Sequence, residues 1–293
     1  MRRQFTILSK NISTTRIWKH RRSNTIFALA LLLAMAPVAR SFAADQIPVD
    51  LELVLAVDIS GSIDPEEAQL QRDGYVAALT DPTFLKAIQG GFLGRIAATY
   101  IEWAGAEISV TVAKWAVIED ERSARNFAST IARAPVHTAL WTSIRNAIEF
   151  SLPQFDSNGF QGTRRVIDIS GDGPNNKGGL VTVARDRAIA MGVTINGLPI
   201  VNDRPSPFGW PAMKDVDLYY GNCVIGGPGA FYIVANSFAD FARAIRKKLI
   251  LEIAGRTPPP AFRIFRATTN GDARKTPPCN IGELRLEWFT DEP

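Results

Sequence analysis

Five oxygen-bearing side chains stand in three short polar segments, and carboxylate and hydroxyl oxygens are the ligands that hard divalent cations prefer. In the first segment, Asp58 is followed at alternate positions by the hydroxyls of Ser60 and Ser62, with a glycine between them that permits a tight turn. Asp172 offers a second carboxylate, and Thr142 can add a hydroxyl from a third segment. These residue types predict a site for one Mg²⁺ ion, which takes six oxygen ligands and accepts neutral ones.

The elements that must position these groups form a parallel α/β sheet, because apolar β-rich runs alternate with helical patterns along the chain. Asp58 follows the apolar run Val49–Val57 and Asp172 follows Arg164–Ser170, so both lie where the carboxyl ends of parallel strands form a crevice. The expected helices begin after Asp64 and near Ser123, Thr142, Leu180, Lys214 and Ser237, and the other expected strands are Gly94–Trp103, Glu107–Val117, Val193–Pro199 and Ala230–Val234.

A tight Ala-Gly-Ala turn joins the strands Gly94–Trp103 and Glu107–Val117, which predicts one hairpin and therefore one antiparallel edge strand. The fold class is therefore α/β: a doubly wound, mostly parallel, Rossmann-like sheet with one antiparallel edge strand and helices on both faces. Asp64, Pro65 and Glu67 occupy the N-cap, N1 and N3 positions of a helix, so we interpret these acids as caps rather than as a second metal site.

The three polar segments, in this order, resemble the metal-ion-dependent adhesion site (MIDAS) of the von Willebrand factor type A (VWA) domain superfamily. Asp58, Ser60 and Ser62 match its D-x-S-x-S motif. Thr142, in T-x-I-x-x-A-I, is similar to its second-loop threonine, and Asp172 in Asp-Gly is similar to its fourth-strand aspartate. The stretches SGDGPNN (170–176) and CVIGGPGAF (223–231) further resemble an uncharacterised, exported, proteobacterial VWA-like family. The resemblance covers residues 46–255 and implies the VWA fold there.

This resemblance implies a binding role rather than turnover. Ser60, Ser62 and Thr142 would offer hydroxyls to the cation, and Asp58 and Asp172 would bind it directly or through water. Two carboxylates just neutralise a divalent ion, so an open coordination position would favour a carboxylate from a partner protein. The implied cation is Mg²⁺, with Mn²⁺ and Ca²⁺ as alternatives, and the implied function is adhesion or envelope assembly.

Two other functions are open at this stage. A Mg²⁺-dependent phosphohydrolase would use Asp58 as nucleophile, but phosphatases of that kind carry D-x-D, and Ser60 occupies the position of the general acid. A structural subunit would use the cation only to stiffen loops. We predict no catalytic residue, because His137 has no companion of triad type and no G-x-S-x-G motif occurs.

Residues 1–43 have the anatomy of a signal peptide. They carry eight Lys and Arg and no Asp or Glu, then the apolar run 26–39, then small residues at Ser41 and Ala43 before the expected cleavage point. The apolar run is shorter than the roughly 20 residues of a membrane-spanning helix, although an uncleaved anchor is the alternative. The sequence therefore predicts an exported protein, periplasmic or secreted, with no membrane span after cleavage.

The remaining chain carries 25 Lys and Arg against 29 Asp and Glu, so it lacks the basic footprint of a nucleic-acid-binding protein. Its two cysteines, Cys223 and Cys279, can pair in an oxidising compartment or stay free, and a bridge would tie the Pro-rich tail 256–293 to the main body. Asp168 lies midway along an apolar strand, and we expect it to be a structural carboxylate with a partner that the sequence does not identify.

Overall fold

A computed structural model describes residues 46–201, 211–255 and 275–290, with side chains as far as residue 287. The leader predicted for residues 1–43 lies outside the described residues. The strands are β1 (Ile47–Val49), β2 (Glu52–Asp58), β3 (Ile96–Trp103), β4 (Ser109–Ile118), β5 (Phe160–Gly162), β6 (Arg165–Gly171) and β7 (Val193–Pro199). The α-helices are α2 (Pro65–Leu79), α3 (Pro82–Gln89), α4 (Glu121–Arg133), α5 (Ile144–Ser151), α6 (Val181–Ala190), α7 (Val216–Tyr219), α8 (Phe241–Ile253) and α9 (Ile281–Thr290). The short 3₁₀ helices are η2 (Leu152–Phe155) and η4 (Phe238–Asp240), and η3 (Tyr220–Val224) is a short π-helix.

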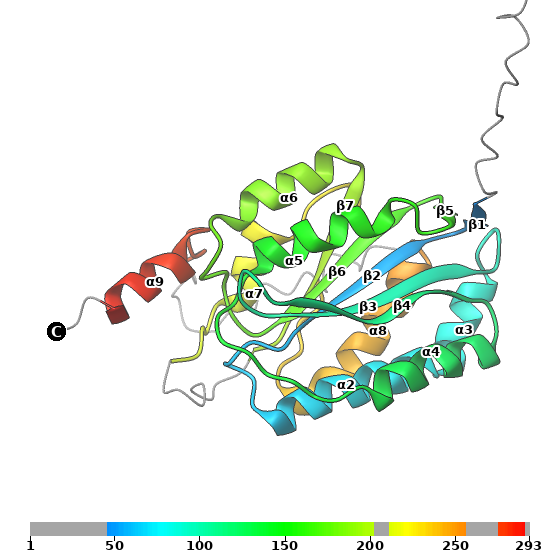
Figure 1. Cartoon of the computed structure of the whole chain (residues 1–293), viewed down its shortest axis with the longest axis horizontal. Helices are drawn as coiled ribbons and strands as arrows, with labels where there is room; N and C mark the ends of the chain where they lie inside the picture. The colour runs from blue at the N-terminus through cyan, green and yellow to red at the C-terminus, as the bar shows by residue number, and fades with distance from the viewer. Residues whose placement is uncertain (1–45, 202–210, 256–274, 291–293) are drawn as a thin grey trace, which may run out of the picture. The chain divides into compact units, whose positions relative to one another are not determined.

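A five-stranded sheet with the order β4-β3-β2-β6-β7 forms the centre of the domain (Figure 1). All neighbouring pairs are parallel except β3 and β4, which form the predicted antiparallel edge hairpin. In register, Asp58 pairs with Trp103, and Val57 pairs with Ser170. The carboxyl-terminal ends of the central strands β2 and β6 therefore lie side by side, and this end of the strands is called the sheet edge below. The arrangement confirms the predicted α/β fold.

Both faces of the sheet are covered, because the side chains of a strand alternate between them. On β2, Leu53 and Leu55 pack into the core beneath α2, α3, α4 and α8, whereas Val54 and Ala56 pack into the core beneath α5, α6 and α7. Figure 1 shows these two helical layers on opposite sides of the strands. No helix of the described residues combines the length and the apolar character that crossing a membrane requires.

The strand predicted at Ala230–Val234 is wrong. This segment runs beside β7 but forms only isolated bridges, at Tyr232 with Gly197 and at Ala235 with Ile200. Pro199 interrupts the ladder, because it has no N–H to donate to this segment. The main-chain hydrogen bonds on either side of Pro199 are present: the Gly197 N–H donates to the Phe231 carbonyl, and the Val201 N–H donates to the Ala235 carbonyl.

Two further elements were not predicted. The first is α3, whose N-cap Asp81 accepts a hydrogen bond from the Thr83 N–H and is followed by Pro82. The second is the small parallel pair of β1 with β5, in which Val49 lies opposite Gly162. Val49 therefore belongs to a separate strand and not to the start of β2.

Candidate metal centre

The Asp58 carboxylate lies at the end of β2 and is fully buried. Its Oδ1 accepts a hydrogen bond from the Ser60 N–H at 2.7 Å, which fixes the turn that follows the strand. Its Oδ2 is buried and has no hydrogen-bond partner among the described residues. A buried carboxylate oxygen without a partner is costly, so this atom has an unmet need for a proton or a cation.

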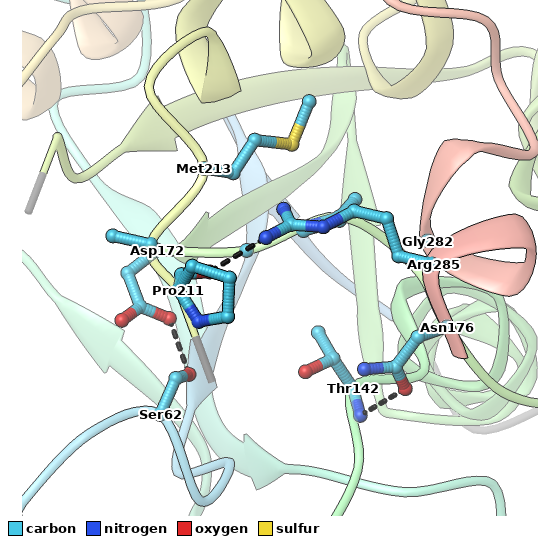
Figure 2. Close-up of a pocket in the computed structure, with 11 residues that line it drawn as sticks. Ser62, Thr142, Asp172, Asn176, Pro211, Met213, Gly282 and Arg285 are labelled. Carbon is cyan, nitrogen blue, oxygen red and sulfur yellow. Dashed lines mark hydrogen bonds between the residues drawn. The ribbon is translucent and has the colours of Figure 1, made fainter. Parts of the chain in front are cut away.

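The same turn connects Asp58 to the second carboxylate, first through the Ser60 main-chain N–H and then through the two serine hydroxyls. The Ser60 and Ser62 hydroxyls lie 3.0 Å apart, and the Ser62 hydroxyl donates to Asp172 Oδ1 at 2.6 Å (Figure 2). Asp172 follows the last residue of β6 directly and is only 8% exposed. Four of the five predicted residues therefore form one chain of neighbouring oxygen groups at the sheet edge.

Thr142 joins the same pocket from the loop before α5. Asn176 holds it there, because the Thr142 N–H donates to Asn176 Oδ1 at 2.9 Å and the Asn176 N–H donates to the Thr142 carbonyl at 2.8 Å. The N-cap of α5 is Ser143, whose hydroxyl accepts from the Asn146 N–H. Because Ser143 caps the helix, the Thr142 hydroxyl is available to the pocket that it lines together with Ser62 and Asp172.

The electrostatics of the two carboxylates fit a bound cation. Burial raises the pKa of Asp58 well above its usual range, and the neighbouring Asp172 raises it further. Burial also raises the pKa of Asp172 to about 6, with a further contribution from Glu67. Desolvation and like charge both disfavour the ionised pair, and a divalent cation would remove both penalties.

The remaining predicted acids have structural roles. The Asp64 side chain accepts from the Glu67 N–H and the Glu67 side chain accepts from the Asp64 N–H, so they form the expected capping box of α2. In the part of the chain that the structure describes, no group of three or more His, Cys, Asp or Glu is arranged to hold a metal. A cation at the Asp58–Asp172 pair would therefore depend on hydroxyl ligands.

The pocket above these residues is small, about 80 Å³, and two of its walls were not predicted. Asn176 is one, although it falls within the SGDGPNN stretch on which the resemblance rests. The other is α9, which contributes Gly282 and Arg285. No local sequence signal connects α9 with the site, because its position depends on tertiary contacts.

Cys223 and Cys279 form a disulfide in the structure, with their Cα atoms 5.4 Å apart. The bridge joins the buried η3 segment to the residues just before α9. The C-terminal segment is therefore covalently attached to the main body beside the pocket.

Comparison with solved structures shows the fold to be a known one. Proximal thread matrix protein 1 from the mussel byssus is 16% identical, with a TM-score of 0.53, over 72% of this chain and 50% of that protein. A second structure of the mussel protein, described as having a zinc-occupied MIDAS motif, is 17% identical over 72% of this chain and 49% of its own, with a TM-score of 0.49. A von Willebrand factor type A protein from Catenulispora acidiphila is 11% identical over 70% of this chain and 43% of its own, with a TM-score of 0.47.

The chain thus spans about half the length of the mussel protein, and at 16% identity that likeness establishes the fold alone. A comparison with curated proteins gave no match. The family described as protein of unknown function (DUF1194) matches residues 48–257, which is most of the chain. The chain therefore belongs to the DUF1194 family, and its domain has a VWA-like α/β fold.

Proposed function

We propose that this protein is an exported, divalent-cation-dependent protein-binding module with a MIDAS-type site. Asp58, Ser60, Ser62, Thr142 and Asp172 would hold the cation, Mg²⁺ first among the candidates. The observation that carries the proposal is the buried Asp58 Oδ2, which has no partner among the described residues and lies in a turn whose Ser62 hydroxyl donates to the second buried carboxylate, Asp172. A cation with open coordination would supply an electrophilic point for a carboxylate of a partner protein.

Three observations favour binding over turnover. The position that carries the general acid in D-x-D phosphatases is occupied here by Ser60, whose hydroxyl cannot act as an acid near neutral pH. The pocket of about 80 Å³ is also far smaller than the roughly 300–1,000 Å³ of pockets that enclose a small-molecule ligand. That volume suits one or two groups of a side chain. A phosphohydrolase with Asp58 as nucleophile would need an exposed carboxylate, whereas Asp58 is 0% exposed.

The cation itself is tested by calorimetry with Mg²⁺ and Mn²⁺ on the wild type and on Asp58→Ala and Asp172→Ala. We expect one ion per wild-type chain and no measurable binding by either variant, because each loses one of two charges. The metal-free variants should unfold at no lower temperature than the metal-free wild type, since each substitution removes a buried carboxyl group that burial and its neighbour disfavour. Asp73→Ala, at an exposed position of α2, is the matched control. Equal affinity in Asp58→Ala would refute the site.

The binding role is tested by capture of partners from an envelope extract. Wild-type protein with Mg²⁺ should retain a partner that EDTA releases, and excess Mg²⁺ should restore the capture. Asp58→Ala should retain none under either condition. A partner that survives chelation and binds the variant equally would mean that the cation only stiffens loops, which is the structural alternative.

A further inference from the structure

Helix α9 is fixed against the loop that follows Asp172. Besides the disulfide at Cys279, the Asn175 side-chain amide donates to Glu283 Oε1 at 2.7 Å. Gly282 packs so tightly that a Cβ there would lie 1.9 Å from the Asn175 carbonyl oxygen. Three contacts of different kinds therefore hold the start of α9 beside the candidate metal centre.

Arg285 extends from α9 into the pocket wall. Figure 2 shows its side chain reaching toward Pro211, whose carbonyl accepts a hydrogen bond from Arg285 Nη2 at 2.6 Å. Arg285 lines the pocket together with Ser62, Thr142 and Asp172. Among the described residues, no carboxylate lies within ion-pair distance of its guanidinium.

In this environment the fold uses only part of the hydrogen-bonding capacity and none of the charge-pairing capacity of the Arg285 guanidinium among the described residues. A guanidinium carries five N–H donors, in a planar fork that matches a carboxylate. Partial burial lowers the pKa of Arg285, which reflects loss of water without gain of a counter-charge. A carboxylate entering the pocket would restore the charge balance and meet the unused donors.

We propose that Arg285 is a specificity-determining residue that selects an acidic side chain of the protein partner at the MIDAS-type site. This inference rests on the proposed function: the site residues hold the cation, and the disulfide-tethered α9 supplies a second, fixed positive group. A partner carboxylate would then be distinguished from an amide of the same shape at two points, the cation and the guanidinium, because only the carboxylate carries a negative charge to pair with each.

The test uses Mn²⁺-loaded protein and two blocked peptides, acetyl-Gly-Asp-Gly-amide and its Asn counterpart. Paramagnetic broadening of the peptide NMR signals reports binding close to the ion. We expect the wild type to broaden the Asp peptide selectively, and Arg285→Gln to weaken that binding about tenfold. Calorimetric Mn²⁺ affinity should stay within about twofold, since Arg285 is not a ligand. Arg285→Lys should recover part of the selectivity, and Arg187→Gln, an equal charge change at an exposed position of α6, should match the wild type.

The outcomes separate this inference from the function beneath it. Arg285→Gln that binds the Asp peptide as the wild type does would overturn the role of Arg285. A wild type that treats the two peptides alike, or Asp58→Ala that binds the Asp peptide normally, would instead overturn the proposed function. In Arg285→Gln, the affinity for the Asp peptide should fall while the hydrogen-exchange rate of the Leu284 amide, which donates to the Asn280 carbonyl, stays unchanged. If that exchange rate rises as the affinity falls, Arg285 merely anchors α9 and the specificity role fails.

Discussion

Gly171 separates two buried polar groups that lack hydrogen-bond partners among the described residues, Asp58 Oδ2 and the Tyr220 hydroxyl. A Cβ on Gly171 would lie 2.7 Å from each of these atoms. The main chain of β6 therefore approaches the Asp58 carboxylate as closely as it does only because this residue has no side chain.

We expect Gly171→Ala to lower the affinity for Mn²⁺ about tenfold, because the added methyl group must displace the Asp58 carboxylate from its position beside Ser60. Calorimetry measures the change directly. Gly173→Ala is the control, since a Cβ there would meet only the Thr142 hydroxyl, at 4.0 Å. Equal losses in both variants would show that any side chain in this loop disturbs the site, and Gly171 would then have no particular role.

At the residue scale, local motifs predict which side chains gather at the sheet edge. Asp58, Ser60 and Ser62 lie in one turn, and Asp172 directly follows a strand, so the sheet topology alone brings them together. The part played by Arg285 could not be predicted in this way. It lies 113 residues beyond Asp172, and its position depends on packing of α9 that no sequence spacing encodes.

At the scale of elements, β6 and α8 are joined by a buried ionic network. Lys248 Nζ lies 2.6 Å from Asp168 Oδ2 and 3.1 Å from Glu252 Oε2, and the Asn196 amide donates to Glu252 Oε1 at 2.7 Å. Asp168, Lys248 and Glu252 are at most 1% exposed. Lys248 is thus the partner of Asp168 that the sequence did not identify. Its ammonium group is shared between the Asp168 and Glu252 carboxylates.

This network predicts a pH dependence of stability. Burial raises the pKa of Asp168 to about 7, so the folded state binds more protons than the unfolded state between about pH 4 and 7. The free energy of unfolding should therefore fall as the pH rises through this window. Asp168→Asn cannot titrate, so relative to it the wild type should lose up to about 1.4 kcal/mol per pH unit. Urea unfolding at several pH values measures the difference.

Parallel curves for the wild type and Asp168→Asn would mean that Asp168 keeps one protonation state throughout. The exposed Asp186→Asn is a suitable control, because that side chain is 64% exposed and its pairing with Arg185 lies at the surface. Its curve should follow the wild type at every pH.

The order of strands and helices is predictable because hydrophobic alternation and helix-start signals are local. Asp81-Pro82 repeats the helix-start signal of Asp64-Pro65, so α3 is predictable from the same local pattern. The pairing of β1 with β5 is not, because it joins three-residue segments more than 100 residues apart. The break in the pairing of β7 with residues 230–235 could not be predicted either. It depends on which carbonyl lies opposite Pro199, and the strand register determines that.

At the scale of the whole molecule, the charge asymmetry of the chain leads to a prediction about maturation. The basic and apolar character of residues 1–43 predicts that the exported form begins at or near Ala44. Intact-mass analysis of a periplasmic fraction should give the mass of residues 44–293. Recovery of the full-length chain from the membrane fraction would favour the uncleaved anchor instead.

The disulfide between Cys223 and Cys279 makes the stability of the protein depend on the oxidation state of its cysteines. It closes a loop across a sequence separation of 56 residues, so the chain-entropy treatment gives a stabilisation of about 4 kcal/mol, with measured values commonly about 2–4. We expect thiol labelling of the exported, denatured but unreduced protein to find no free cysteine. Reduction should lower the free energy of unfolding by about 2–4 kcal/mol in urea melts. The double variant Cys223→Ser/Cys279→Ser should match the reduced wild type and should not respond to reductant. Two free thiols in the exported protein would mean that α9 is held by non-covalent contacts alone, such as those of Asn175, Gly282 and Arg285, and the covalent tether would then contribute nothing to the pocket that α9 helps to form.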